Sequence, residues 1–364
     1  MQLEGLGEAH RRLLLVLLQH GPMKRRELAQ RMSLSAGSIT RLTQPLEERG
    51  YVAATAVQAN ATGRPQHVVD AVLPPDCVLG VSISDVDVRV VRTDLRAHVL
   101  DDVTARIAGR GPDEVVDLIA DLVSRLPLDD VVGVGVGVSG IVRGGRLVVR
   151  SPFLRWAGVP LADLLEERLG RPCVLANDVA AVALAEAWFG VGREAASFLV
   201  LTVGAGVGGA TVVRGVVQDA EEHGIGLLGH LPVLWPDGTM RRANMSLTDR
   251  GLLVLAQSYG SAAPDPGAVE AGIDDGAVRA AEEFAFATGA LAATGAAFLV
   301  PGQIVVLGER AGVIANHREA FRAGMASARE TEAPELRVTV RTHNRDVWAR
   351  GAAVTALVRH VTAP

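Results

Sequence analysis

A glycine-rich segment in the second half of the chain has the composition of an anion-binding loop. It reads Gly204-Ala205-Gly206-Val207-Gly208-Gly209 and lies between two Val-rich segments. Backbone N–H groups in such a loop can hold a phosphate, because glycine lets the anion approach closely. The same glycines also suit a tight turn between two strands. The spacing does not match a dinucleotide fingerprint, since a predicted strand follows it in place of a helix.

Two polar residues, Asn177 and Asp178, lie where a predicted strand gives way to a predicted helix, Asp178–Trp188. In a cleft, a carboxylate can take the proton from a substrate hydroxyl. Asn and Asp are also common helix N-caps, because their side-chain oxygens accept backbone N–H groups. From the residue types alone we favour the N-cap.

The segment Met23–Arg49 predicts two short helices joined by a tight turn. Ser35 can cap the second helix, in which Ile39, Leu42 and Leu46 then recur at the spacing of one buried stripe. Small polar residues and an Arg remain on the other faces. This is the shape and chemistry of a helix that enters a DNA major groove. An ordinary helical hairpin would show the same pattern.

Two short predicted strands follow, Tyr51–Val57 and His67–Val72, around a tip that contains Gly63-Arg64-Pro65. An amphipathic helix, Leu3–His20, precedes the helical pair. Three helices and a β-hairpin predict a winged helix-turn-helix over residues 1–72, and Arg64 at the tip can reach a phosphate or the minor groove. The residues that we expect to contact DNA are Lys24, Arg25, Arg26, Ser35, Gly37, Ser38, Thr40, Arg41, Gln44 and Arg64.

Charge is distributed unevenly along the chain. From Arg11 to Arg49 there are eight basic and three acidic residues, whereas the whole chain carries a net charge of −5. The remainder is therefore acidic, and a basic module on an acidic body fits contact with operator DNA at one end only.

Cysteine usage and hydropathy exclude several classes of protein. Cys77 and Cys173 are the only cysteines, which rules out a disulfide framework and a multi-Cys zinc site. The apolar run Leu13–Leu18 is too short to span a membrane. We therefore expect a cytoplasmic protein without a membrane partner.

After a predicted linker, residues 73–76, Val-rich strands alternate with helices in two successive groups. This pattern predicts two α/β lobes with a cleft between them: residues 77–195 with the C-terminal helix 347–361, and residues 196–340. The predicted strands are Val78–Ser84, Val86–Val91, Arg96–Ala105, Val131–Val138, Pro172–Leu175, Phe198–Val203, Ala210–Val213, Ile304–Leu307 and Leu336–Val340. The other predicted helices are Pro112–Leu126, Val159–Leu169, Leu247–Tyr259, Gly276–Ala297, Ala315–Ala328 and Val347–Val361.

At this point the chain resembles the ROK family of repressors, open reading frames and sugar kinases. The resemblance implies an α+β and α/β protein: a winged helix-turn-helix followed by a two-lobed, actin-like and hexokinase-like (ASKHA) body. Family members with the winged helix look like sugar-responsive repressors, and members without it are kinases. The segments that carry the resemblance are Leu79–Asp94, Val132–Val142, Ser151–Trp156, Phe198–Gly215, Gly226–His230 and Ile304–Gly308.

The first phosphate loop departs from the family pattern, which is Asp-x-Gly-Gly-Thr. The matching residues are Ser82-Ile83-Ser84-Asp85-Val86, without either glycine, the acid or the hydroxyl. Asp85 would place a carboxylate beside the γ-phosphate, and like charges at roughly 4 Å repel by about 4 kcal/mol at intermediate dielectric. We therefore expect no ATP use and no catalytic residue, and we favour the turn for the second loop. The residues of the two vestigial phosphate loops are Ser84, Asp85, Gly204, Gly206 and Gly208.

The resemblance assigns Asn177 to sugar binding and Asp178 to the family's catalytic position, so an effector contact there gains weight. The family's Asn after Ser-Pro is Phe153 here, and the Glu of its Glu-x-Gly-His motif is Leu227. A free hexose in this less polar pocket would leave hydroxyls unpaired. The effector could be a sugar, an amino sugar or a sugar phosphate, or there could be none. The residues that we expect to contact it are Gly140, Asn177, Asp178 and His230.

The family's zinc motif, a His followed by Cys-x-Cys-x4-Cys, is also missing. Its cysteine positions hold Thr239, Arg241 and Ser246, and only His230 remains. Because Thr and Ser are poor zinc ligands and Arg is none, we expect no metal and no cofactor. His230 is either a ligand contact or a hydrogen-bonded core residue. His223 and the adjacent glutamates are expected in a solvated loop.

Three functional hypotheses follow from these residues. The first is a repressor that binds DNA as a homodimer or homotetramer and whose kinase-like body binds an effector without phosphorylating it. The second is an active or bifunctional sugar kinase, supported by Asp178 and the intact glycines. The third is a DNA-binding protein with no ligand.

Overall fold

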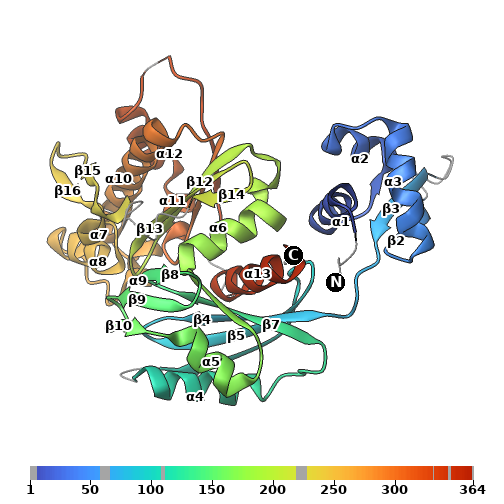
Figure 1. The fold of residues 1–364 in the computed structure, drawn as a ribbon. Helices are drawn as coiled ribbons and strands as arrows, with labels where there is room; N and C mark the ends of the chain where they lie inside the picture. The colour runs from blue at the N-terminus through green and yellow to red at the C-terminus, as the bar shows by residue number, and fades with distance from the viewer. Residues whose placement is uncertain are drawn as a thin grey trace.

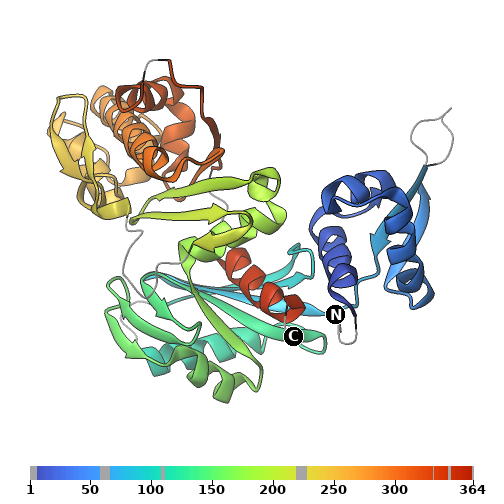
Figure 2. The ribbon, with the colours of Figure 1, turned by 45° about the horizontal axis from the view of Figure 1, so that its top comes forward.

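The computed structural model describes residues 6–57, 66–107, 111–218, 228–330, 332–342 and 346–362. A small N-terminal domain of three helices and a three-stranded sheet stands beside a larger body built on two five-stranded sheets (Figures 1 and 2). None of the described helices combines the length and hydropathy that crossing a bilayer requires.

The N-terminal domain is the predicted winged helix. Ser35 caps its third helix as expected, since the Ser38 N–H donates to Ser35 Oγ at 3.1 Å. Leu28, Ile39 and Leu46 are fully buried together with four leucines of the first helix. The wing tip with Arg64 lies outside the described residues. The elements are α1 (Glu8–His20), β1 (Met23–Lys24), α2 (Arg25–Met32), α3 (Ala36–Glu48), β2 (Val52–Val57) and β3 (Gln66–Ala71), with sheet order β1-β3-β2.

The first lobe of the body is a mixed sheet of order β11-β7-β4-β5-β6. Its outer face is covered by α4 (Pro112–Val123) and α5 (Leu161–Leu169) (Figure 1). The strands are β4 (Cys77–Ile83), β5 (Asp87–Asp94), β6 (Val99–Arg106), β7 (Val131–Val138) and β11 (Cys173–Asn177), and a small separate sheet contains β8 (Ile141–Arg143), β9 (Leu147–Ser151) and β10 (Trp156–Val159).

The second lobe is a sheet of order β14-β13-β12-β17-β18, with most of its helices on the outer face. The single helix expected at Ala315–Ala328 is wrong, because His317 leaves helical geometry and separates α11 from α12. The strands are β12 (Ser197–Val203), β13 (Val207–Val213), β14 (Val216–Gln218), β17 (Gln303–Leu307) and β18 (Arg337–Val340), with a ribbon of β15 (Pro232–Leu234) and β16 (Met240–Arg242). The helices are α7 (Ala243–Ser246), α8 (Asp249–Ser258), α9 (Pro266–Glu270), α10 (Asp275–Leu299), α11 (Ala311–Asn316) and α12 (Arg318–Ser327).

Two helices, α6 (Asp178–Phe189) and the C-terminal α13 (Val347–Thr362), lie between the two sheets (Figures 1 and 2). α13 packs directly on the strands of the first lobe. A Cβ atom at Gly80 or Gly135 would overlap backbone carbonyls of α13, so only glycine permits this approach. The close neighbours predicted for the Val-Gly strand, β7, are therefore confirmed.

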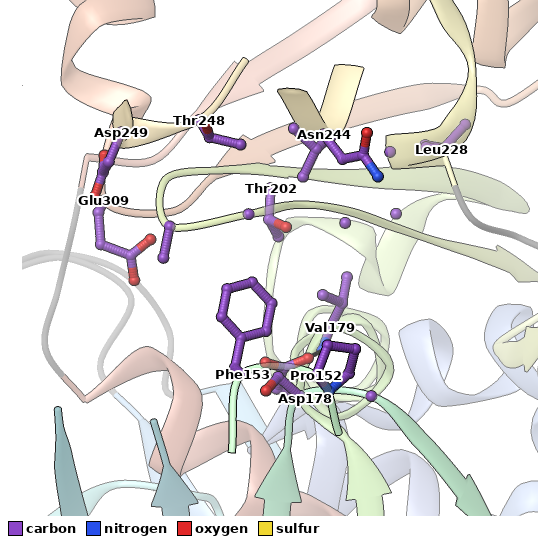
Figure 3. Close-up of a pocket in the computed structure, with 18 of the residues that line it drawn as sticks. Pro152, Phe153, Asp178, Val179, Thr202, Leu228, Asn244, Thr248, Asp249 and Glu309 are labelled. Atoms are coloured by element: carbon purple, nitrogen blue, oxygen red, sulfur yellow. Dashed lines mark hydrogen bonds between the residues drawn. The ribbon is translucent and has the colours of Figure 1, made fainter. Parts of the chain in front are cut away.

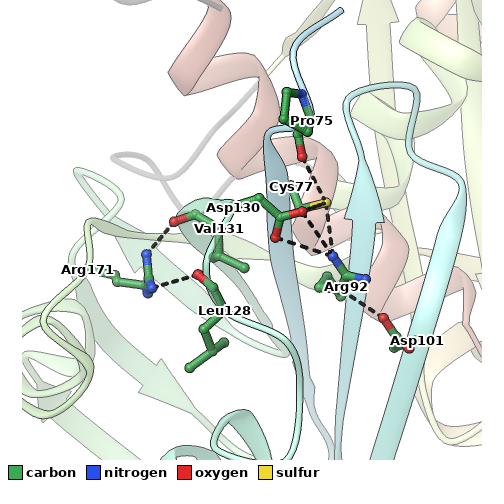
Figure 4. A network of polar contacts seen from close by, with 8 residues as sticks. All are labelled: Pro75, Cys77, Arg92, Asp101, Leu128, Asp130, Val131 and Arg171. Atoms are coloured by element: carbon green, nitrogen blue, oxygen red, sulfur yellow. Dashed lines mark hydrogen bonds and ion pairs between the residues drawn. The ribbon is translucent and has the colours of Figure 1, made fainter.

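A polar network fastens the start of the body to the linker (Figure 4). The Cys77 sulfur lies 3.6 Å from the Pro75 carbonyl oxygen and 3.4 Å from Asp130 Oδ2, and its single S–H is shared between these two acceptors. Arg92 joins Asp130, at 3.3 Å, to Asp101, at 2.7 Å. Burial raises the pKa of the Cys77 thiol to about 11, so the thiol stays protonated at neutral pH. The predicted linker is thus tied to the body at Pro75.

Candidate functional site

The predicted DNA-reading helix, α3, presents polar side chains to solvent along one face. Thr40, Arg41 and Gln44 are exposed, whereas Ile39 and Leu46 on the opposite face are fully buried. The Gln44 amide nitrogen lies 3.2 Å from Glu48 Oε1 at the surface. An Arg and neutral hydrogen-bonding groups on one exposed helix face can address base edges and phosphates together.

The basic residues before α3 have two different environments. Lys24 and Arg26 are exposed, and the Lys24 backbone N–H donates to Glu27 Oε2 at 3.2 Å. Arg25 is half-buried and donates to Glu47 Oε1 at 2.6 Å, which ties the start of α2 to the end of α3. Arg25 therefore holds the two helices together, and its DNA contact stays a prediction.

The other predicted site residues of the body, apart from Gly204, meet in a cleft of about 2180 Å³ between the two lobes. Figure 3 shows Pro152, Phe153, Asp178 and Val179 on one side and residues of the second lobe, such as Glu309, on the other. The predicted residues that line the cleft are Ser84, Asp85, Gly140, Asn177, Asp178, Gly206, Gly208 and His230.

Asn177 acts as the N-cap of α6. Its Oδ1 accepts from the backbone N–H groups of Val179 and Ala180 at 3.0 and 3.1 Å, and its Nδ2 donates to the Gly140 carbonyl at 2.9 Å. Gly140 has φ +122°, and a Cβ there would overlap Arg150, so this position requires glycine. Asn177 and Gly140 therefore bind each other, and their effector contacts remain predictions.

Asp178 faces the cleft from the first turn of α6 (Figure 3). Burial raises the pKa of its carboxyl to about 6; the Val179 N–H, which donates to Oδ1 at 2.8 Å, opposes the rise and the Glu309 carboxylate adds to it. Such a carboxyl can accept a hydrogen bond or a proton from a ligand hydroxyl near neutral pH.

The first phosphate loop is closed by its own hydroxyl. Ser84 Oγ accepts from the backbone N–H groups of Val86, at 3.1 Å, and Asp87, at 2.9 Å. A phosphate loop would offer such N–H groups to the ligand, but here the side chain of the loop consumes them. Asp85 is exposed at the tip. The missing glycines are visible in the sequence, but they did not predict this role for Ser84.

The glycines of the second loop serve close packing. A Cβ at Gly204 would overlap the Glu309 carboxylate, and one at Gly208 would lie 2.6 Å from Val179 Cγ2. Neither glycine has a left-handed φ. The Gly204 N–H donates to the Gly206 carbonyl at 3.1 Å. Glu309, held by the Trp348 indole N–H at 3.2 Å, thus places a carboxylate against this loop.

Further polar groups in the cleft were not predicted. Ser139 and Asn244 line the cleft, and their Oγ and Oδ1 atoms are buried with no hydrogen-bond partner among the described residues. Phe153 and Leu228 add apolar walls (Figure 3), and the Phe153 ring lies beside Gly206. Because a buried polar atom without a partner costs free energy, these atoms favour a ligand with hydrogen-bonding groups. No local pattern marks Ser139 or Asn244, since only the fold brings them to the cleft.

The positions of the zinc motif form a different cluster. Arg241 pairs with Asp237 at 2.6 Å and lies 4.4 Å from the centre of the Trp235 ring. Thr239 Oγ1 donates to Asp237 Oδ1 at 2.6 Å, and Ser246 Oγ donates to the carbonyl of Arg242 at 2.9 Å. Nowhere in the described part of the chain do three His, Cys, Asp or Glu side chains gather as for a metal ion. This ion pair and cation–π contact hold the β15–β16 ribbon. His230 is exposed at the cleft, so it is not a core residue.

Two α/β lobes around a cleft form a sugar-kinase-like body. The winged helix joined to this body is a domain of the DNA-binding type. Residues 78–359 match the family model described as ROK family, and residues 8–56 match that of the MarR family. The chain belongs to the ROK family.

Known proteins with similar sequences or folds include regulators and kinases. The xylose repressor of Caldicellulosiruptor bescii is 22% identical over 241 residues, which cover 64% of this chain and 60% of the repressor. A crystal structure of a ROK family transcriptional regulator, a homologue of the Escherichia coli MLC protein, has a TM-score of 0.74 at 19% identity and covers 97% of this chain and 95% of that one. A ROK family glucokinase from Streptomyces griseus, in complex with glucose and AMPPNP, has a TM-score of 0.67 at 24% identity and covers 77% of this chain and 99% of that one. These structures show the fold that the chains share.

Proposed function

We propose that this protein is a transcriptional repressor of genes for sugar or amino-sugar metabolism. It binds operator DNA through α3 and the wing, and its cleft binds a sugar-class effector. One observation carries the proposal: the chain exposes a helix suited to DNA while its own side chains use or cover the phosphate-binding groups of the cleft. The names of the similar repressor and regulator support it.

The carboxylates at the two phosphate loops oppose ATP. Five carboxylates line the cleft, Asp85, Asp87, Asp178, Asp249 and Glu309, together with five arginines, Arg89, Arg106, Arg150, Arg241 and Arg250. Arg310 is paired with Asp249 at 3.0 Å and with Glu270 at 2.9 Å. At the loops themselves, a triphosphate would meet the carboxylates of Asp85 and Glu309 where a kinase supplies N–H groups and a metal ion. We therefore propose that the body does not phosphorylate its ligand and needs neither ATP nor zinc.

The cleft fits an effector that has both hydroxyls and an apolar face. Asp178 and Asn244 offer hydrogen-bond acceptors, Ser139 offers a hydroxyl, and Phe153 and Leu228 offer apolar surface. Sugar rings combine these two properties. A thermal-shift screen with neutral sugars, amino sugars and sugar phosphates, each compared with Asp178→Asn, tests the assignment. We expect a member of the panel to raise the Tm of the wild type, to weaken its operator binding, and to lose both effects in the variant.

The screen also separates the alternatives. If no compound shifts the Tm and operator binding is intact, the protein is a ligand-independent DNA-binding protein. The second candidate function, a sugar kinase, is favoured by Asp178, whose pKa of about 6 suits a general base. ATP consumption that depends on a sugar and disappears in Asp178→Asn would replace our proposal with this one.

The assembly and location complete the proposal. We propose that the protein is cytoplasmic. We also propose that it is a homodimer or homotetramer, because two recognition helices bind two half-sites about one helical turn apart more tightly than one helix binds a single half-site. Light scattering on the full chain, with and without operator DNA, would give the number of copies.

A further inference from the structure

The winged helix contacts the body at a short 3-10 segment, η1 (Val191–Glu194), which follows α6. Arg31, in the last turn of α2, donates to Glu194 Oε1 at 2.7 Å. The His20 ring lies 3.4 Å from the same oxygen. On the other side, Arg193 Nη1 donates to the Gln19 carbonyl at 2.8 Å. Charged groups from both domains therefore meet at one point, which we call the η1 contact.

Two further attachments surround the η1 contact. Arg96, in the turn after β5, donates to Asp70 Oδ1 of β3 at 2.6 Å. The buried leucines of α1 belong to the same apolar cluster as α6, α13 and Leu95. The winged helix is thus packed on the body by apolar and polar contacts as well as joined by a linker.

α6 connects this contact to the cleft. It begins at Asp178, which faces the cleft, and its buried face packs against α13 and β13. At its other end the Val191 N–H donates to Glu186 Oε2 at 3.0 Å, and Gly192 lies tightly under the Phe198 ring. α6 and η1 are therefore close-packed on each other and on β12, and close-packed elements transmit displacement. Arg31 precedes Ser35, the N-cap of the recognition helix, by four residues.

We propose that Arg31, Arg193 and Glu194 are positioning residues that hold the recognition helix in a fixed orientation. Through α6, they also couple its orientation to the state of the cleft. This proposal rests on the proposed function, because a fixed orientation affects DNA binding when two winged helices address two half-sites. It assigns Arg31, one of the basic residues near α3, to the body and not to DNA.

The first experiment compares two duplexes. A palindromic duplex is selected by the full wild-type chain from a random-sequence pool, and a second duplex carries one half-site of it. We expect Glu194→Gln and Arg31→Gln to weaken binding to the palindrome at least fivefold and to the half-site less than twofold. Asp117→Asn, which breaks a surface ion pair with Arg168 in the body, is the matched control and should change neither. Unchanged affinities, or equal losses on both duplexes, would overturn the proposal, the latter because Arg31 would then contact DNA directly.

The second experiment needs no DNA, so its result is independent of the proposed function. We expect Glu194→Gln to speed amide hydrogen exchange severalfold in residues 19–31 and to leave α4 unchanged. Asp178→Asn should also change the exchange rates in residues 19–31. In the double variant with Glu194→Gln, these rates should equal those of Glu194→Gln alone. If the effect of Asp178→Asn stays within the cleft, or simply adds to that of Glu194→Gln, the coupling through α6 is wrong. If the selection yields no duplex while the exchange results hold, the failure lies in the proposed function.

Discussion

The recognition helix and the phosphate loops both resemble ligand-binding motifs, but their polar groups differ. Those of the helix are exposed to solvent, whereas those of the loops bind other groups of the protein. On α3, the side chains of Thr40 and Arg41 remain exposed, whereas Ile39 and Leu46 of the apolar stripe are fully buried and Leu42 is partly buried. In the cleft, Ser84 binds the N–H groups of its own loop and the Glu309 carboxylate covers Gly204. Hydrogen-bonding groups that bind each other have little left to offer a ligand.

This difference is the one that we expect of a kinase-like body that keeps its fold and, as proposed above, does not use ATP. The glycines of the second loop remain necessary because neighbouring side chains pack on them, whatever the ligand. A glycine-rich loop by itself is therefore weak evidence for nucleotide binding. The positions of the surrounding side chains decide whether its N–H groups are accessible.

The largest expected effect is on DNA binding by α3. Arg41→Glu places a negative charge against the phosphates, so we expect the affinity for a duplex selected by the wild type to fall at least 100-fold, about 2.7 kcal/mol. Circular dichroism and Tm should stay unchanged, because Arg41 is exposed. Fluorescence anisotropy measures the affinity, and Ser38→Glu should act in the same direction. An equal loss in Arg168→Glu, on the body, would show a general charge effect and not a contact by α3.

The next effect concerns packing in the second loop. Gly208→Ala would bring a Cβ within 2.6 Å of Val179 Cγ2 and 2.7 Å of Thr202 Oγ1, so we expect a loss of about 2 kcal/mol in the free energy of unfolding. In Gly133→Ala the nearest atom would be 3.7 Å away, and this variant is the control in a strand. Denaturant unfolding measures both. If Gly208→Ala leaves the free energy of unfolding unchanged, packing does not require this glycine, and an anion-binding role for the loop is favoured.

A smaller change, and one that increases the free energy of unfolding, is expected when Asp178 is replaced. Because the folded state raises the pKa of this carboxyl to about 6, its ionisation costs stability as pH rises from about 4 to about 6, and the cost is complete above that range. Asp178→Asn should therefore stabilise the protein by about 1–2 kcal/mol at pH 7.5, and the gain should vanish below pH 4. The control, Asp113→Asn at an exposed position, should have no such pH dependence. A gain that persists at low pH would rule out ionisation as its cause.

The smallest effect is expected at the first loop. Ser84→Ala removes the acceptor of two backbone N–H groups, but water can reach this turn, so we expect a loss of about 1 kcal/mol. Ser124→Ala, which removes one exposed hydrogen bond, should cost less than half of that. Thermal unfolding at pH 7.5 compares the two. If Mg²⁺–ATP raises the Tm of Ser84→Ala but not that of the wild type, the Ser84 hydroxyl alone prevents the loop from binding phosphate.

The elements whose signals are local could be predicted from the amino-acid sequence. Ser35, the apolar stripe through Ile39 and Leu46, and the strands around the wing predicted the winged helix, because N-caps and periodicity depend on residues within a few positions of each other. The alternation in Val131–Val138 likewise predicted a strand with close neighbours. The resemblance to the ROK family then placed Asn177 and Asp178 at a cleft.

Which polar groups remain available to a ligand depends on contacts between segments that are distant in the chain. β1 is too short to show a period, and the break at His317 lies inside a helical pattern. Ser139, Asn244 and Glu309 reach the cleft from segments far apart in the chain, and Arg31 meets Glu194 across 163 residues. Whether a polar group binds a ligand or another part of its own chain depends on which neighbours folding brings to it, and local sequence does not contain that information.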